Sequence, residues 1–420
     1  MGKTSTRAGY EGVITDTQLK GGKTGGSITN GFGVFAYNTG TTAWASASIA
    51  PNFMYNQQVY WATDWKYEPV KYWPNGKDAA NSTSPSNTAT PAAVQMLSFF
   101  AYAPYVNPNP SSGTFDSTES SGITQLSTNS KTGDPMVHYT LDASHKVDLL
   151  WGTRGDLTYS ETDGTDNTLA SLSPYAYNVD LTKQNKTEKV NFVFKHALAK
   201  LGGNAGLKVV LDVDDNGSHE TGNGSLDQLS NVTISNITVQ NKANNAIPSG
   251  VFDLANGTWY ADESKTAITV GTSTAGSYVN YNISSTDMNS TIYHATGGTY
   301  DAGTWTPTGV PTATAINVFK DGSGDPFYLI PGAEQTLTIS VTYTVRTYDT
   351  NLSGSYSTVT QTITNDVKIT PAVNKFYTIV LHLGLTSVKF AASVSDWDAA
   401  TDTEKKEVWL PSNVVPAPAP

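Results

Sequence analysis

The chain has 420 residues, a formal net charge of −11 and a pI near 4.9. This acidic balance argues against nucleic acid and against an anionic membrane surface as partners, because both require clustered Lys and Arg. No apolar run is long enough to span a bilayer, and the absence of cysteine excludes disulfides and thiolate metal sites. The chain is too long for one ordinary core, so we expect two domains.

The composition indicates an all-β protein. Thr, Ser, Asn and Gly are abundant, aromatic residues make up 10% of the chain, and charged residues only 15%. This mixture of β-branched, aromatic and turn-forming residues favours strands over helices. No secretory signal sequence is present, so we expect that any targeting segment has been removed.

Two strands are predicted in the first part of the chain. They are "GFGVFAY", from Gly31 to Tyr37, and "MLSFFAYAPYV", from Met96 to Val106. The polar stretches "NGKDAANSTSPSNTATPAA" and "NPNPSSGTFDSTESSG" lie before and after the second strand. Loops of this length inside a compact domain are usually surface insertions.

An aromatic segment lies between these two strands. Its large side chains are Trp61, Trp65, Tyr67, Tyr72 and Trp73. Exposed aromatic faces of this kind stack on sugar rings in carbohydrate-binding proteins. Large aromatics also bury well in sandwich cores, and we favour core packing here.

The middle of the chain contains the expected domain junction. The polar stretch "LTKQNKTEK" leads into "VNFVFKHALAKL". Residues 190–194 alternate in hydrophobicity as a strand does, and residues 197–201 have helical spacing, with Gly202 ending about one turn of helix. We therefore expect an N-terminal domain over residues 1–187 and a C-terminal domain over residues 188–420.

An acidic loop follows, with the sequence "DVDDNGSHETGN". Asp212, Asp214 and Asn216 have the spacing of the first oxygen ligands of an EF-hand, and Gly217 allows the sharp turn of such a loop. The twelfth position holds Asn223 instead of the bidentate Glu. The loop is therefore either a calcium site or a plain acidic hairpin whose turn is Asn216-Gly217.

Three segments of the second half alternate apolar and polar residues with period 2. They are "TLTISVTYTVR", "YTIVLHL" and "VKFAASV", and in the first of them Leu337, Ile339, Val341, Tyr343 and Val345 share one face. Polar turns separate the segments. Successive strands of this length predict a β-sandwich or a Greek-key barrel.

No catalytic constellation is found in the sequence. The histidines are scattered without metal-ligand spacing, at His138, His145, His196, His219, His294 and His382. We interpret His382 as a strand residue and His196 as the start of a short helix. The Ser/Gly runs lack the strand-to-helix context of a nucleophile elbow, so we expect no enzymatic activity.

The C-terminal segment is unusual for the end of a chain. In "EKKEVWLPSN", residues 404–413, four charges precede the apolar run Val408-Trp409-Leu410, and a Pro-rich tail follows. Chain ends are usually small and polar, because an untethered terminus gains little from being ordered. The pattern of this segment is typical of a β-strand that pairs with another strand.

The order and spacing of several segments resemble the fimbrillins of Bacteroidales, in their major and Mfa-like branches, which are the subunits of type V pili. The resemblance runs from about Gly31 to Pro411, and no single motif in it is decisive. It implies two tandem transthyretin-like β-sandwich domains with long loop insertions and only short helices. The segments are "PNFMYNQQV", "WKYEPVKYWPN", "LSFFAYAPYV", "VNFVFKHALAKL", "FYLIPGAEQTLTISVTYTV" and "FYTIVLHLGLTSVKFAASVSDWD".

The resemblance also implies a function and an assembly route. The protein would be a structural subunit that is exported as an outer-membrane lipoprotein precursor and joins other pilus subunits at the cell surface. An arginine-specific protease would remove an N-terminal segment, and the first candidate bond is Arg7-Ala8. The opened groove would then accept a donor strand from a neighbouring subunit. In this chain the donor strand would be formed by Glu407, Val408, Trp409 and Leu410.

The alternative is an extracellular glycan-binding protein or an adhesive pilus tip, whose ligand would be a glycan or protein on a host or bacterial surface. A tip subunit need not donate a strand, whereas a stalk subunit must. The apolar run at residues 408–410 therefore favours a stalk subunit, although a final strand that pairs with its own sheet would have the same pattern.

Overall fold

A computed structural model gives the structure of the chain. The residues that it describes are 19–20, 23–24, 27–28, 31–74, 95–115, 122–141, 147–154, 178–182, 190, 192–202, 206–211, 230–284, 288, 291–294, 300–301, 304–305, 316–318, 326–383 and 388–396.

The described residues form two compact units, each built mainly of antiparallel strands. A short 3-10 helix, η1 (Trp44–Ser46), interrupts the strands. The expected all-β class is confirmed. Unit 1 takes its described residues from Met1–Thr140, His145–Leu198 and Ser249–Ile268, and unit 2 takes them from Leu141–Ser144, Ala199–Pro248 and Thr269–Pro420.

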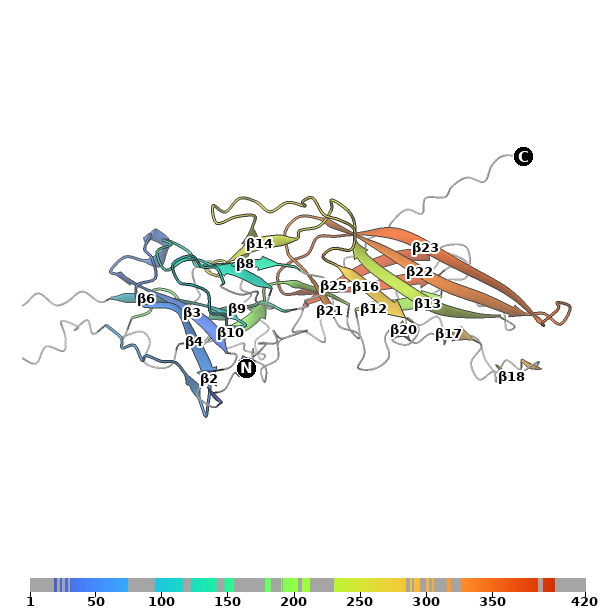
Figure 1. The fold of residues 1–420 in the computed structure, drawn as a ribbon, viewed down its shortest axis with the longest axis horizontal. Helices are drawn as coiled ribbons and strands as arrows, with labels where there is room; N and C mark the ends of the chain where they lie inside the picture. The colour runs from blue at the N-terminus through green and yellow to red at the C-terminus, as the bar shows by residue number, and fades with distance from the viewer. Residues whose placement is uncertain are drawn as a thin grey trace, which may run out of the picture. The chain divides into compact units, whose positions relative to one another are not determined.

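The first sheet of unit 1 has the strand order β10-β9-β6-β3-β4-β5 (Figure 1). Its strands are β3 (Phe32–Gly40), β4 (Met54–Trp61), β5 (Trp65–Lys66), β6 (Met96–Ala103), β9 (Leu150–Arg154) and β10 (Phe192–His196). Both strands predicted in the first part of the chain are present, as β3 and β6. They pair with each other in the centre of the sheet, with Val34 opposite Ala101.

The second sheet of unit 1 has the order β15-β14-β8-β7. Its strands are β7 (Ile123–Leu126), β8 (Met136–Thr140), β14 (Ser249–Asp253) and β15 (Thr258–Tyr260). The sheets face each other through the rings of Trp151 and Phe252, whose centroids are 5.8 Å apart. The indole N–H of Trp151 also donates a 2.9 Å hydrogen bond to the carbonyl of Leu254.

The first sheet of unit 2 contains β11, β12, β20, β21, β24 and β25. Their bounds are β11 (Ala199–Gly202), β12 (Leu207–Leu211), β20 (Ile316–Asn317), β21 (Pro326–Leu329), β24 (Lys375–Leu383) and β25 (Val388–Asp396). β11 and β12 both pair in parallel with β24, and β25 pairs antiparallel with β24 along its whole length.

The second sheet of unit 2 has the order β16-β13-β22-β23, and β17 also pairs with β13. Its strands are β13 (Ser230–Asn241), β16 (Asn280–Ser284), β17 (Thr291–His294), β22 (Gln335–Tyr348) and β23 (Tyr356–Ile369). Two small ribbons complete the described strands, namely β1 (Lys23–Thr24) with β2 (Ser27–Ile28) and β18 (Tyr300–Asp301) with β19 (Thr304–Trp305).

The core of unit 2 follows the predicted alternation. Leu337, Ile339, Val341 and Tyr343 of β22 are buried in one cluster with the inward residues of β13 and β24. The opposite face of the long β22–β23 hairpin (Figure 1) carries a ladder of paired hydroxyls. Its oxygen–oxygen distances are 2.6 Å for Ser340–Thr364, 2.8 Å for Thr342–Thr362 and 2.9 Å for Thr344–Thr360.

The prediction of a helical turn at residues 197–201 was wrong. Ala199–Gly202 is strand β11, which pairs with β21 and β24, and His196 ends strand β10 instead of starting a helix. A segment this short cannot offset the cost of nucleating a helix, so pairing on both sides decides its conformation. The junction expected after residue 187 lies outside the described residues, and β10 is part of unit 1.

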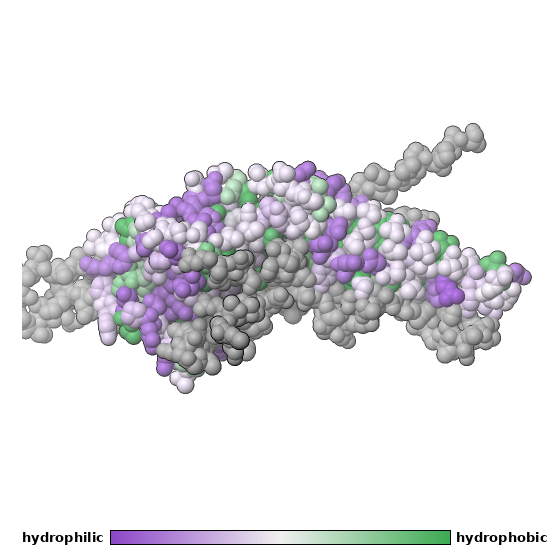
Figure 2. All heavy atoms as spheres, viewed as in Figure 1, coloured by the Kyte–Doolittle hydropathy of each residue, from purple (hydrophilic) through white to green (hydrophobic). Residues whose placement is uncertain are grey.

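Polar and weakly polar residues dominate the visible face of the described chain, and hydrophobic residues appear there as separate spots (Figure 2). This is typical of sheets that bury one face and expose the other. Within the described part of the chain, no helix is both long and apolar enough to cross a bilayer.

Candidate functional site

An apolar cleft of about 420 Å³ lies on one face of the first sheet of unit 1. Side chains alternate along a strand, so the face opposite Trp151 carries its neighbour Leu150. Leu150 belongs to a buried cluster with Phe32, Val34 and Phe99. The cleft is therefore built on the face that points away from the second sheet, and its volume is within the usual range of ligand pockets, about 300–1,000 Å³.

Aromatic residues form two walls of the cleft. One wall comes from the segment after β4 and contains Trp65, and the other comes from β10 and contains Phe194. The ring of Phe32 contacts both, with centroid distances of 5.1 Å to Trp65 and 5.1 Å to Phe194 in edge-to-face geometry. Trp73 packs in the same manner on Phe99 at 5.9 Å. These contacts hold the walls on the sheet at both sides of the cleft.

Small residues in the sheet make room for the β10 wall. A Cβ added at Gly152 would lie 2.7 Å from the Cβ of Ala101 and 3.2 Å from ring atoms of both Phe192 and Phe194. Since contacts below 3.0 Å force neighbouring atoms to move, a side chain at position 152 would push Ala101 or the two phenylalanine rings away. Glycine at position 152 therefore lets the rings of β10 approach the sheet closely.

The described lining residues can bind apolar side chains but provide no acid–base pair. Lys71 is the charged residue among them, and none of them is Asp, Glu or His. The hydroxyl of Tyr67 donates a 3.3 Å hydrogen bond to the carbonyl of Lys71, which holds this part of the wall together. The described lining of the cleft is thus mainly aromatic and aliphatic.

The aromatic segment of the sequence is divided by the structure. Trp65, Tyr67 and Trp73 pack against the buried cluster of the first sheet, as the core-packing interpretation expects. Trp61 packs edge to face on Trp65 at 5.2 Å. Tyr72 is 81% exposed and is open to solvent, whereas Trp65, Tyr67 and Trp73 line the cleft.

The site residues predicted from the sequence lie outside the described part of the chain. They are Arg7 and Ala8 at the expected cleavage bond, Asp212, Asp214 and Asn216 in the acidic loop, and Glu407, Val408, Trp409 and Leu410 in the expected donor strand. Among the residues that are described, no group of three or more Asp, Glu or His could hold a metal ion.

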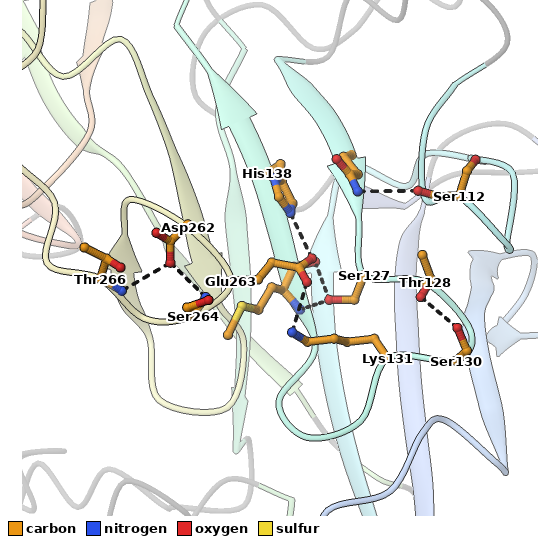
Figure 3. Close-up of polar contacts among 12 residues, drawn as sticks. Ser112, Ser127, Thr128, Ser130, Lys131, His138, Asp262, Glu263, Ser264 and Thr266 are labelled. Carbon is orange, nitrogen blue, oxygen red and sulfur yellow. Dashed lines mark hydrogen bonds and ion pairs between the residues drawn. The ribbon is translucent and has the colours of Figure 1, made fainter.

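Two charged clusters in unit 1 were not predicted. In the first, Glu263 lies in the loop after β15 and contacts His138 of β8 and Lys131, which precedes β8 (Figure 3). Its carboxylate oxygens are 3.0 Å from His138 Nε2 and 3.0 Å from Lys131 Nζ. The hydrogen bond with His138 is the largest influence on Glu263, whose pKa falls to about 2 although burial raises it, and Lys131 adds to the decrease. This carboxylate is therefore ionised throughout the physiological range.

The second cluster is centred on Lys265, two residues further along the same loop. Its ammonium lies 2.8 Å from Oδ2 of Asp253 and contacts Oδ2 of Asp134. Asp253 is fully buried, and this burial, followed by the charge of Asp134, raises its pKa to about 6. No local pattern announces either cluster, because His138 and Glu263 are 125 positions apart and Lys265 and Asp134 are 131 apart.

The comparisons with known proteins point to pili. No family model matches the chain. Over 208 residues it is 30% identical to "Fimbrium subunit Fim1C" of Phocaeicola vulgatus (strain ATCC 8482), an alignment that covers 48% of this chain and 43% of that relative. The match thus spans less than half the length of the curated relative.

A solved structure extends the likeness to nearly the whole fold. The crystal structure of a fimbrial protein from Bacteroides vulgatus ATCC 8482 superposes with a TM-score of 0.56 at 21% identity, covering 91% of this chain and 96% of that one. At this identity the likeness establishes the fold. The chain therefore has the fold of a Bacteroides fimbrial protein, and the resemblance to Bacteroidales fimbrial subunits seen in its sequence is confirmed by a curated fimbrium subunit.

Proposed function

We propose that the protein is a structural, non-enzymatic subunit of a bacterial surface pilus and acts at the cell surface. The observation that carries this proposal is the 30% identity to a fimbrium subunit over 208 residues. The fold shared with a Bacteroides fimbrial protein supports it. The cleft of unit 1 is consistent with it too, because its lining suits docking and lacks an acid–base pair.

We further propose that subunits assemble by strand donation. The precursor is cut at Arg7-Ala8. The segment of residues 404–413, still attached to its own subunit, then docks as a strand on the neighbouring subunit. In an extended strand Val408 and Leu410 point the same way, about 7 Å apart, while Trp409 points the other way. Such a pair suits the apolar cleft of unit 1, while backbone hydrogen bonds along a strand edge add affinity.

Fibre formation after protease treatment, followed by electron microscopy, tests this function. The wild-type protein is expected to form fibres, whereas the double variant Val408→Asp, Leu410→Asp is expected to stay monomeric, because a carboxylate cannot be buried in an apolar cleft without a partner. Ala417→Asp, in the Pro-rich tail outside this segment, is the matched control and should form fibres. Circular dichroism of each variant checks that the β-structure is intact. Fibres from the double variant would contradict strand donation by this segment, and a wild-type protein that never polymerises would contradict the pilus function.

An adhesive role is the second candidate, and the exposure of Tyr72 (81%) and Val70 (58%) favours it. Exposed side chains of this size are more costly in water than polar ones, and aromatic faces bind sugar rings or partner proteins. Binding of the wild-type protein to a glycan array, lost in Tyr72→Ala, would support this role. Equal binding by both proteins would remove Tyr72 from it.

A further inference from the structure

An amine and two carboxyl groups meet at the edge of the unit 1 core. Lys265 Nζ lies 2.8 Å from Oδ2 of Asp253 and also contacts Oδ2 of Asp134. The side chain of Asp253 is fully buried, whereas that of Asp134 keeps 13% of its surface exposed. We propose that Lys265 and Asp253 condense without an enzyme to an intramolecular isopeptide bond, with Asp134 transferring the protons.

The surroundings of Asp253 suit an acceptor carbon. Oδ1 accepts a 2.8 Å hydrogen bond from the backbone N–H of Ala255, and Oδ2 accepts a 3.0 Å hydrogen bond from Nδ2 of Asn256. When the carbon becomes tetrahedral, negative charge builds up on Oδ1, where the fixed N–H of Ala255 stabilises it as an oxyanion hole does. Nζ is in contact with Oδ2, which is bonded to Cγ, the carbon that Nζ must attack. Holding the two reacting groups this close raises the rate of such reactions.

The protonation states of Asp253 and Lys265 are consistent with a slow condensation. A neutral carboxylic acid is a better electrophile than a carboxylate, and burial followed by the charge of Asp134 raises the pKa of Asp253 to about 6. Burial lowers the pKa of Lys265, but its hydrogen bonds with both carboxylates raise it on balance. The lysine therefore rests as an ammonium, and the reaction is slow. Slow chemistry is sufficient for a bond that forms once in the life of each molecule.

The condensation balances without an oxidant, metal or co-reactant. The ammonium of Lys265 gives one proton to the carboxylate of Asp134, and the freed lone pair forms the bond to Cγ of Asp253. The proton on Asp134 then joins the hydroxyl of Asp253 as the C–Oδ2 bond breaks, so that one water leaves. The nitrogen finally gives a second proton to Asp134, which releases it to solvent, and an uncharged amide remains.

Two features distinguish this lysine from the other paired lysines described. Its ammonium lies over the ring of Tyr260, whose centroid is 5.9 Å from Nζ. It also has a second carboxylate to carry protons away. Lys242 contacts the carboxylate of Asp366, but this pair is 51% and 38% exposed and has no buried acid. It offers a control within the same chain.

Intact-mass spectrometry of the purified full chain tests the proposal. The wild-type mass is expected to be lower than the sequence mass by one water, and peptide mapping should join Lys265 to Asp253. Lys265→Arg is expected to have its full sequence mass, because arginine keeps the ion pairs but forms no such amide. Lys242→Arg should keep the water deficit. Asp253→Asn should lose ammonia in place of water, since an amide acceptor releases its nitrogen.

Three results would overturn the proposal. A wild-type protein at its full sequence mass, folded by circular dichroism, has no isopeptide bond. A peptide that joins Lys265 to Asp134 would show that Asp134 and not Asp253 is the acceptor. A water deficit that persists unchanged in Lys265→Arg would place the modification elsewhere in the chain and would equally rule out this pair.

Discussion

Trp151 of β9 and Phe252 of β14 pack edge to face with ring centroids 5.8 Å apart, and this contact joins the two sheets of unit 1. Phe252 is fully buried and also packs on Trp259 at 5.1 Å. Its two partners, Trp151 of β9 and Trp259 of β15, are far from each other in the sequence. The ring of Phe252 is therefore central to the packing of unit 1.

Phe252→Ala is expected to lower the free energy of unfolding by about 3–5 kcal/mol, because it removes a buried ring and leaves a cavity between the sheets. Urea denaturation followed by tryptophan fluorescence measures the change, since Trp151 and Trp259 both border the cavity. Tyr72→Ala is the control and should change stability by less than about 0.5 kcal/mol, because that side chain is exposed. Equal stabilities of the two variants would contradict the packing described.

Glu263→Gln is expected to destabilise the protein by about 1 kcal/mol at pH 7, through loss of its partly exposed pairs with His138 and Lys131. The folded-state pKa of Glu263, about 2, lies below its ordinary value. Its stabilisation is therefore present above that ordinary value and is lost as the pH falls through about 2. The difference between variant and wild type, measured by urea denaturation, should shrink from pH 5 to pH 2, roughly the interval between the two pKa values.

Glu334→Gln provides the matched control, since Glu334 pairs with Lys368 at 2.9 Å but both side chains are more than half exposed. Its effect should be close to zero at every pH. A loss of stability as large as that of Glu263→Gln would mean that burial does not set the strength of these pairs.

Ile339→Ala is expected to cost about 2–5 kcal/mol, because Ile339 is fully buried in the unit 2 core. Thr342→Ala, three positions further along β22, removes one rung of the hydroxyl ladder and should cost less than about 1 kcal/mol. Thermal denaturation compares the two variants. A larger loss for Thr342→Ala would show that the ladder and not the core carries the stability of this hairpin.

Calcium binding at Asp212, Asp214 and Asn216 remains a prediction from the sequence. If these residues bind the ion, millimolar calcium should raise the melting temperature, because a ligand of the folded state stabilises it by mass action. Asp214→Ala should abolish the rise, while Asp262→Ala, in a different loop, should leave it unchanged. An unchanged melting temperature of the wild type with calcium would identify the acidic loop as a plain hairpin.

Limited digestion with trypsin under native conditions is expected to cut first after Arg7. The segment around it contains Thr, Ser, Ala and Gly, which suits a protease that requires an extended chain. Arg154 ends β9, where it pairs with Phe192 of β10 and is held in the sheet. N-terminal sequencing and mass spectrometry identify the cut. A first cut after Arg154, with Arg7-Ala8 intact, would contradict the processing proposal.

Alternation in the sequence predicted strand β22, because one face of this strand packs in the core and the other is partly exposed to solvent. It failed at β11, where the local spacing is helical and the strand forms only through pairing with β21 and β24. The residues of the cleft were visible as aromatic segments, but their convergence on Phe32 depends on pairings between distant strands. The contacts of Glu263 and Lys265 were invisible for the same reason.

The path of the chain imposes an order on synthesis. β8 pairs with β14 from Ser249 to Asp253, and these residues follow β11, β12 and β13 of unit 2. A chain emerging from the ribosome, or entering another compartment N-terminus first, therefore leaves that edge of β8 unpaired until residue 253 has appeared. Unpaired strand edges pair readily with strands of other chains. The nascent protein is therefore expected to be prone to aggregation until β14, which follows the first strands of unit 2, has been synthesised. A shortened chain that ends at Leu198 would keep that edge permanently exposed and is expected to aggregate instead of folding as an independent domain.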